Sequence, residues 1–150
     1  MQVLYINQPF LKNMCLMDII MTKKEVQKRV LQDGKPLALN KFIWDEKTNT
    51  FSSKESDLFI NFNTIINCTF NTGSHCTFIT GSYCTFNTGN NCMFKTINYC
   101  TFNTSYNCVF TTGGGCTFNC ERNANIINNY PNNIINFSNN YDVYGYPLYR

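Results

Sequence analysis

The sequence predicts an all-β protein: a β-solenoid (β-helix) of about four 16-residue, two-sided coils with a small N-terminal helix–hairpin cap. Three observations favour this fold. Cysteine recurs every eight residues from Cys68 to Cys116, phenylalanine follows each of these cysteines two positions later, and threonine usually follows after two more. Self-similarity at a short fixed period is typical of repeat architectures. A Cys-Thr-Phe-Asn-Thr-Gly-x-x unit is therefore expected to organise residues 60–123.

Residues 1–20 are interpreted as a leader, either ordered or disordered, because a clear helix start follows them. Thr22 and Glu25 form a capping-box pattern, in which each side chain can bond to the other residue's backbone N–H. An apolar stripe at helical spacing follows and ends before Gly34; it consists of Val26, Val30 and Leu31. A short helix is therefore expected at this point.

A hairpin is expected after the helix. Residues 42–45 and 50–52 are rich in strand-forming side chains, and the polar residues 46–49 separate them. The ends of a solenoid are open strand edges that need covers. Residues 21–59 are therefore predicted to form a helix and hairpin cap at the N-terminal end.

Each repeat unit predicts one half-buried strand and one turn. Cysteine, phenylalanine and the second threonine share one parity and alternate with polar residues, which is the period of a β-strand. Glycines in the turns are expected to supply positive φ, and they are Gly73, Gly81, Gly89 and Gly113. One earlier unit is assigned to residues 60–64, with Ile60 in the cysteine position and Phe62 in the phenylalanine position.

Two units are expected to form one coil, because eight residues are too few to return the chain to its starting side. Alternate units support this pairing, since one set is nearly invariant and the other varies at its second and fourth positions. Phenylalanine and cysteine should fill the core, because a free cysteine behaves as a small apolar residue. The cysteines should then form two columns, Cys68 with Cys84, Cys100 and Cys116, and Cys76 with Cys92 and Cys108.

Residues 124–150 form a tail that is rich in asparagine and tyrosine. The segments at 125–128 and 133–136 both read Asn-Ile-Ile-Asn and keep an eight-residue spacing. The tail is interpreted as a C-terminal cap. It forms either a degenerate extra coil or a partly disordered segment, and ordered packing is preferred.

Composition argues against several function classes. Twelve Lys and Arg against nine Asp and Glu give a net charge of +3, which is too weak to drive nucleic-acid binding. One histidine and the absence of a Cys-x-x-Cys pair favour neither a metal site nor a catalytic triad. We therefore expect a protein that is not an enzyme, holds no metal or cofactor, and binds neither nucleic acid nor membrane.

Cysteine usage and the N-terminal residues favour an intracellular protein with reduced thiols. Nine cysteines, an odd number, fit poorly with complete disulfide pairing. Residues 1–21 lack the basic region of a secretory signal, and polar residues interrupt their apolar stretches. No run of 18 apolar residues is present.

The tandem Cys-Thr-Phe-x-Thr-Gly-x-x octads resemble a repeat family of β-solenoid proteins of unknown function, found among giant DNA viruses of amoebae. The segments at 21–26, 42–52 and 58–62 resemble the N-terminal unit of that family. The resemblance covers about residues 21–123. It implies a repeat β-protein in the host cytoplasm or the virion, and it brings no known activity with it.

Two outward surfaces are candidate interaction sites. The nearly invariant strands should present a lattice that consists of Thr69, Asn71, Thr85, Asn87, Thr101, Asn103, Thr117 and Asn119. Such residues suit outward strand positions in any case. The lattice is also similar to the ice-binding faces of insect antifreeze solenoids, although those present Thr-x-Thr. The variable strands should expose an apolar contact made of Ile79, Met93 and Val109, covered by the tail or by a second subunit.

The sequence therefore favours a structural or protein-interaction module whose partner is itself or another protein. The alternative is a ligand-binding module that holds ice or a polysaccharide on the Thr/Asn lattice.

Overall fold

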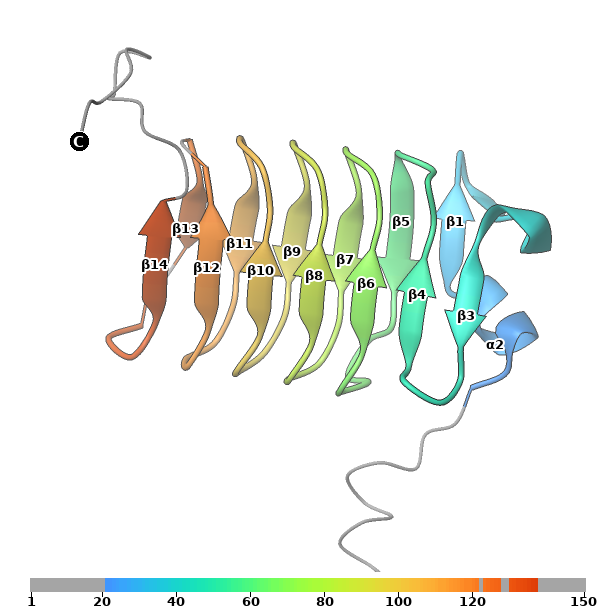
Figure 1. Cartoon of the computed structure of the whole chain (residues 1–150), viewed down its shortest axis with the longest axis horizontal. Coiled ribbons are helices and arrows are strands. Elements are labelled where there is room, and N and C mark those ends of the chain that lie inside the picture. Colours follow the sequence, from blue (N-terminus) through green and yellow to red (C-terminus); the bar gives the residue numbers. More distant parts are fainter. Residues whose placement is uncertain (1–20, 122, 128–129, 138–150) are drawn as a thin grey trace, which may run out of the picture.

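The computed structural model describes residues 21–121, 123–127 and 130–137. Two seven-stranded sheets face each other and extend along the long axis of the molecule (Figure 1). Parallel neighbours in the regular part of each sheet are 16 residues apart, since Thr69 pairs with Thr85 and Thr85 pairs with Thr101. The predicted two-sided β-solenoid is therefore confirmed. It has about five coils instead of four, because strands continue the sheets on both sides of the predicted repeat.

Every coil contributes one strand to each sheet. The front sheet, nearest the viewer in Figure 1, contains β3 (Ile43–Asp45), β4 (Thr50–Ser52), β6 (Thr69–Asn71), β8 (Thr85–Asn87), β10 (Thr101–Asn103), β12 (Thr117–Cys120) and β14 (Ile134–Phe137). The back sheet contains β2 (Lys35–Pro36), β1 (Val30–Gln32), β5 (Leu58–Asn61), β7 (Thr77–Ile79), β9 (Met93–Lys95), β11 (Val109–Thr111) and β13 (Asn125–Ile127).

Phenylalanine side chains fill the space between the sheets. In the front sheet, the rings of Phe86 and Phe102 stack with centroids 5.0 Å apart and planes 5° apart. Phe94 of the back sheet meets both rings edge-on, with centroids 5.1 Å away. The same pattern extends from Phe70 to Phe118. Both arrangements are favourable geometries for aromatic pairs, and the predicted inward position of these rings is confirmed.

The repeat cysteines occupy the two predicted columns. Cys76 N donates to Cys92 Sγ and Cys100 N donates to Cys116 Sγ, each over 3.4 Å. Their thiols also donate to turn carbonyls two residues earlier, as Cys100 Sγ does to Asn98 O. The described cysteines are buried and form no disulfide bond. They fill the corners of the core and bind the turns.

The turn glycines have a different role from the predicted one. Positive φ occurs at the residue before each repeat cysteine, in one column at Asn67, Tyr83, Tyr99 and Gly115 and in the other at His75, Asn91 and Asn107. Asn123, before Ala124, continues the second column. Gly73, Gly81, Gly89 and Gly113 do not have positive φ. They allow neighbouring coils to approach, since a Cβ on Gly81 would lie 2.5 Å from Thr64 O. The prediction was wrong because these positions need glycine to avoid a clash with the neighbouring coil, and they do not need positive φ.

The first coil has a different register from the predicted one. Ile60 pairs with Phe78, so Ile60 takes the phenylalanine position and Leu58 takes the cysteine position. Phe62 is fully buried but lies in the next inward position, which threonine occupies in later coils. The chain takes ten residues instead of eight to go from Ile60 to Phe70. A search for an eight-residue repeat in the sequence does not detect this longer turn.

A short helix, α2 (Lys23–Gln27), begins at the predicted capping box. Glu25 N donates to Thr22 Oγ1 over 3.2 Å, and Thr22 N donates to Glu25 Oε1 over 2.9 Å. The bond from the Thr22 backbone lowers the pKa of the Glu25 carboxyl. Among the described residues, no helix is long and apolar enough to cross a membrane.

The predicted helical stripe is wrong beyond Val26. Val30 and Leu31 lie in β1, which pairs antiparallel with β5 and covers the edge of the back sheet. Asp33 and Gly34 both have positive φ and form the two-residue turn between β1 and β2. An Asp-Gly pair is a strong signal for such a hairpin, and it explains why the chain leaves the helix early.

The predicted hairpin of β3 and β4 is confirmed, and it covers the first coil. After the 3₁₀ helix η2 (Leu39–Lys41), Trp44 of β3 pairs antiparallel with Phe51 of β4. The Trp44 ring meets Phe62 edge-on with centroids 6.0 Å apart, and Trp44 Nε1 donates to Met21 O over 2.7 Å. The N-terminal end of the solenoid is therefore closed by both antiparallel pairs (Figure 1).

The described part of the tail continues both sheets. β13 pairs in parallel with β11, and β14 pairs in parallel with β12. Ile126 and Ile135 take the positions that Phe110 and Phe118 hold in the preceding coil. The predicted leader, residues 1–20, and the rest of the predicted tail cap, residues 128–129 and 138–150, lie outside the described residues.

Four of the inward threonines bond to backbone groups at the turns. Thr80 Oγ1 donates to Gly81 O over 3.3 Å and Thr112 Oγ1 donates to Gly113 O over 3.0 Å. Thr72 and Thr88 make the same bond to the glycine that follows them. Thr96 and Thr104, which no glycine follows, have buried hydroxyls without a hydrogen-bond partner among the described residues.

We expect Thr96→Val to raise the free energy of unfolding by about 1 kcal/mol, because it removes an unpaired buried hydroxyl and keeps the shape of the side chain. Thr112→Val is the matched control in the same column. It should lower the free energy of unfolding by about 1 kcal/mol, since it removes the bond to Gly113 O. Urea denaturation followed by circular dichroism measures both changes. Destabilisation of similar size by both substitutions would contradict this account.

Candidate functional site

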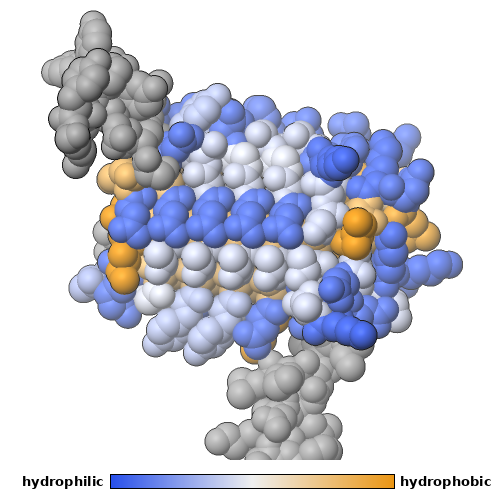
Figure 2. Space-filling model, in the orientation of Figure 1, coloured by the Kyte–Doolittle hydropathy of each residue, from blue (hydrophilic) through white to orange (hydrophobic). Residues whose placement is uncertain are grey.

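The asparagines of the front sheet form one continuous hydrogen-bonded ladder. Asn87 Nδ2 donates to Asn71 Oδ1 over 2.7 Å, and each later rung donates to the one before it over 2.8 Å. The ladder begins at Ser52 Oγ, which accepts from Asn71 over 3.1 Å. Its members are Ser52, Asn71, Asn87, Asn103, Asn119 and Asn136, and we call it the Asn ladder. The front sheet therefore carries a straight row of hydrophilic side chains (Figure 2).

A column of threonines runs beside the Asn ladder. Thr69, Thr85, Thr101 and Thr117 pair in register and point outward, half-buried, from the same strands. The structure therefore brings all eight residues of the predicted Thr/Asn lattice onto one face. Sequence analysis did not include Ser52 and Asn136, although Asn136 belongs to the Asn-Ile-Ile-Asn spacing noted in the tail. Whether the lattice binds a ligand stays a prediction.

The lattice has spare hydrogen-bonding capacity at regular intervals. A side-chain amide has two N–H groups and two acceptor lone pairs, and the Asn ladder uses one of each at an inner rung such as Asn103. Neighbouring rungs repeat at the strand spacing of about 4.8 Å. The remaining N–H and carbonyl sites are therefore available to water or to a periodic ligand at a fixed spacing.

The back sheet presents the predicted apolar residues. Met93 is 53% exposed and pairs with Val109, which is half-buried in the same column. Ile79 is half-buried in the adjacent column, where it pairs with Lys95. Phe59, 39% exposed, lies in register with Thr77 and extends the column of Met93. Phe59 was not predicted to face outward, because the sequence placed the first coil in the wrong register.

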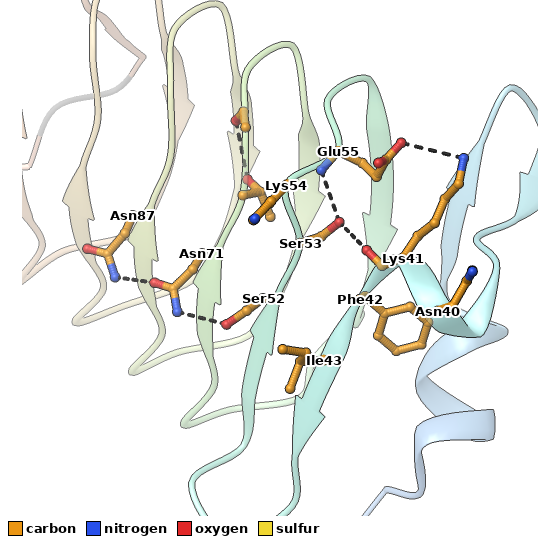
Figure 3. Close-up of a pocket in the computed structure, with 12 residues that line it drawn as sticks. Asn40, Lys41, Phe42, Ile43, Ser52, Ser53, Lys54, Glu55, Asn71 and Asn87 are labelled. Atoms are coloured by element: carbon orange, nitrogen blue, oxygen red, sulfur yellow. Dashed lines mark hydrogen bonds and ion pairs between the residues drawn. The ribbon is translucent and has the colours of Figure 1, made fainter.

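A groove of about 840 Å³ lies where the cap meets the front sheet (Figure 3). Ile43 of β3, 68% exposed, lies on its cap side, and Ser52, Asn71 and Asn87 of the Asn ladder lie on the other. Sequence analysis did not predict this groove, because it depends on how the cap sits on the sheet.

The polar groups at the cap end of the groove bind one another. Lys41 Nζ lies 3.7 Å from Glu55 Oε1, and Ser53 Oγ donates to Lys41 O over 2.7 Å. Glu55 Oε1 also accepts from Gln32 Nε2 over 3.1 Å. These contacts tie η2 and β1 to the segment after β4, and they give Lys41 and Glu55, two of the three charged residues of the groove, a structural role.

Contacts between stacked cysteines, together with burial, raise the pKa of most core thiols. Burial raises the pKa of the Cys120 thiol to about 11, and the nearby Cys108 adds to this effect. At Cys100 the contact with Cys116 favours the thiolate, but the contact with Cys84 and burial outweigh it and raise the pKa to about 11. Cys76 is an exception, because its contact with Cys92 lowers its pKa to about 7 despite burial. No group of three or more His, Cys, Asp or Glu in the described residues could hold a metal ion.

Comparison of the chain with protein-family models, with curated proteins and with solved structures found no match.

We expect the free energy of unfolding to fall as the pH rises from 9 to 11. In the unfolded chain the thiols ionise near their ordinary pKa of 9.0, whereas Cys100 and Cys120 stay protonated in the fold up to about 11. The unfolded state then binds fewer protons, so each thiol should lower stability by roughly 1 kcal/mol per pH unit at most. Urea denaturation at pH 8, 9, 10 and 10.5 measures this slope.

Cys120→Ala is the control for this pH dependence. The variant keeps every lysine and tyrosine, so a shallower slope isolates the contribution of the thiol. Parallel curves for the variant and the unmodified protein would contradict the raised thiol pKa.

Proposed function

We propose that this protein is a non-enzymatic structural module that associates with protein, including a second copy of itself. The observation that carries the proposal is the difference between its two ends. Antiparallel strands and Trp44 close the N-terminal end, whereas the last coil ends in exposed apolar side chains. Ile134 is 57% exposed and Phe137 is 60% exposed on that coil. Exposed apolar side chains that gather in one place mark interaction sites.

The back sheet supports the same function. Phe59 and Met93 are exposed in one column, and the half-buried Val109 adjoins Met93. The front sheet instead ties its outward amides to one another. Contacts with protein are therefore expected at the back sheet and the last coil.

A viral origin and an intracellular location belong to this proposal. They are supported by the resemblance of the octads to the repeat proteins of giant DNA viruses, and by eight described thiols that are buried and form no disulfide bond. Reduced thiols are the usual state inside cells. The host cytoplasm or the virion is the proposed location.

A second candidate function is binding of ice or a polysaccharide on the Thr/Asn lattice. The Asn ladder favours it, because the hydrogen bonds between rungs hold donors and acceptors at a regular spacing. The neighbouring groove at Ile43 would give such a ligand an apolar contact beside the first rungs.

Light scattering on the purified chain tests the proposed self-association. The chain has a mass of 17.4 kDa, and we expect the weight-average mass to rise above this value as the concentration increases from about 1 to 100 μM, a range typical of small interfaces. A mass of 17.4 kDa at every concentration would contradict self-association.

Substitution on the lattice tests the second candidate. If the lattice binds a ligand, Thr85→Lys with Thr101→Lys should abolish ice shaping or glycan retention without changing the circular dichroism spectrum, because two long cations disrupt the flat face. Thr77→Lys with Met93→Lys is the matched control, since these residues are in register on the back sheet. Absence of both ice shaping and glycan binding in the unmodified protein would end this candidate.

A further inference from the structure

The last coil ends in strand edges that lack a partner among the described residues. β13 and β14 are the outermost strands of their sheets. Ile134 N donates to Cys116 O in the preceding coil, over 2.9 Å. Alternate residues of a parallel strand bond to opposite neighbours, as the inward Thr104 does when its N–H donates to Asn119 O in the next coil. The N–H and C=O groups of Ile135 and Phe137 therefore face the open end.

The side chains at this end are apolar and incompletely covered. Ile126 and Ile135 hold phenylalanine positions but are only half-buried. Phe137 is in register with Cys120, which is fully buried, yet Phe137 is 60% exposed. Hydrophobic side chains accordingly appear at the end of the molecule opposite the cap (Figure 2). Within the part of the chain that the structure describes, the core of the solenoid thus reaches the surface at this coil.

Nothing charged protects this edge within the described residues. Residues 123–127 and 130–137 contain no Lys, Arg, Asp or Glu. Natural sheets usually protect an exposed edge with charged side chains, because an open edge pairs readily with another strand. Two such uncharged edges can approach each other without electrostatic repulsion.

The opposite end of the molecule has edge strands that are protected against pairing. β2 consists only of Lys35 and Pro36, and β3 is three residues long and ends in Asp45. Very short strands, charged residues and proline hinder the addition of another strand to an edge. A second copy is therefore expected to offer its own last coil. Identical edges that meet around a two-fold axis run antiparallel and form a closed, self-complementary contact.

We propose that two copies associate end to end through the edges of β13 and β14, as a closed dimer that does not grow into a fibre. This inference rests on the proposed self-association and adds its site and symmetry. The end of the solenoid measures about 20 Å by about 25 Å, from two sheets about 10 Å apart and strands and corners of about eight residues. The contact would bury roughly 1,000 Å² in total, the lower limit for a specific interface, so the dimer should dissociate in the micromolar range.

Analytical ultracentrifugation of the full chain, from about 1 to 100 μM, tests the proposal. We expect a monomer–dimer equilibrium for the unmodified protein and a dissociation constant at least tenfold higher for Phe137→Lys. Tyr83→Lys is the matched control, because Tyr83 is similarly exposed but lies in the turn between β7 and β8, away from the end and from the back-sheet contact. It should leave the equilibrium unchanged.

A second measurement does not depend on the fold of the Phe137 variant. In a Cys15→Ser background, single cysteines that replace Tyr130, in the last coil, or Lys47, in the β3–β4 turn, can carry spin labels, because the eight described native thiols are buried. In the proposed dimer two labels at position 47 lie about 50 Å apart, from about ten strand spacings. Labels at position 130 should lie much closer.

The outcomes separate the two proposals. A monomer at all concentrations overturns self-association and with it the dimer. A dimer that Phe137→Lys leaves intact, or whose labels at position 47 are the closer pair, overturns the end-to-end contact and keeps self-association. Species larger than a dimer overturn the closed symmetry.

Discussion

The contact between phenylalanine rings of successive coils is the constraint on which the structure depends. Phe94 touches four other rings: it stacks on Phe78 and Phe110 at 5.1 Å and meets Phe86 and Phe102 edge-on. This repeat is close to the spacing of about 4.8 Å between paired strands. Ring packing and backbone pairing therefore require almost the same rise per coil along the solenoid axis. Each buried ring contributes about 2–3 kcal/mol by burial, and its aromatic contacts add to this.

That constraint determines what the surface can be. Because each coil repeats the one before it, any outward position becomes a column of neighbours at the same spacing. At this spacing the asparagines of successive coils bond to one another. The tyrosines at one corner, Tyr83 and Tyr99, stack with centroids 5.2 Å apart. Regular columns satisfy one another along the solenoid. The columns stop at the groove beside Ile43 and at the last coil, and apolar side chains are exposed at both places.

Sequence analysis could predict what depends on strict repetition. The columns of cysteine and phenylalanine, the 16-residue coil and the capping box at Thr22 all follow from spacing, and the structure confirms them. It failed where three-dimensional contacts override the pattern. Ile60 was placed out of register because a longer turn follows it, and Val30 was placed in a helix although the edge of β5 needs a partner. The groove depends on how the cap packs against the front sheet, and no local sequence pattern indicates this packing.

The Asn ladder has a direction, because every amide nitrogen faces the N-terminal end and every accepting oxygen faces the C-terminal end. One amide turned over would place two nitrogens or two oxygens against each other, so each rung fixes the orientation of the next. Aligned amides polarise one another and strengthen their bonds. Their dipoles also add along the row. The front sheet therefore carries a small electric dipole of its own, with its negative pole at Asn136, although no residue of the row is charged.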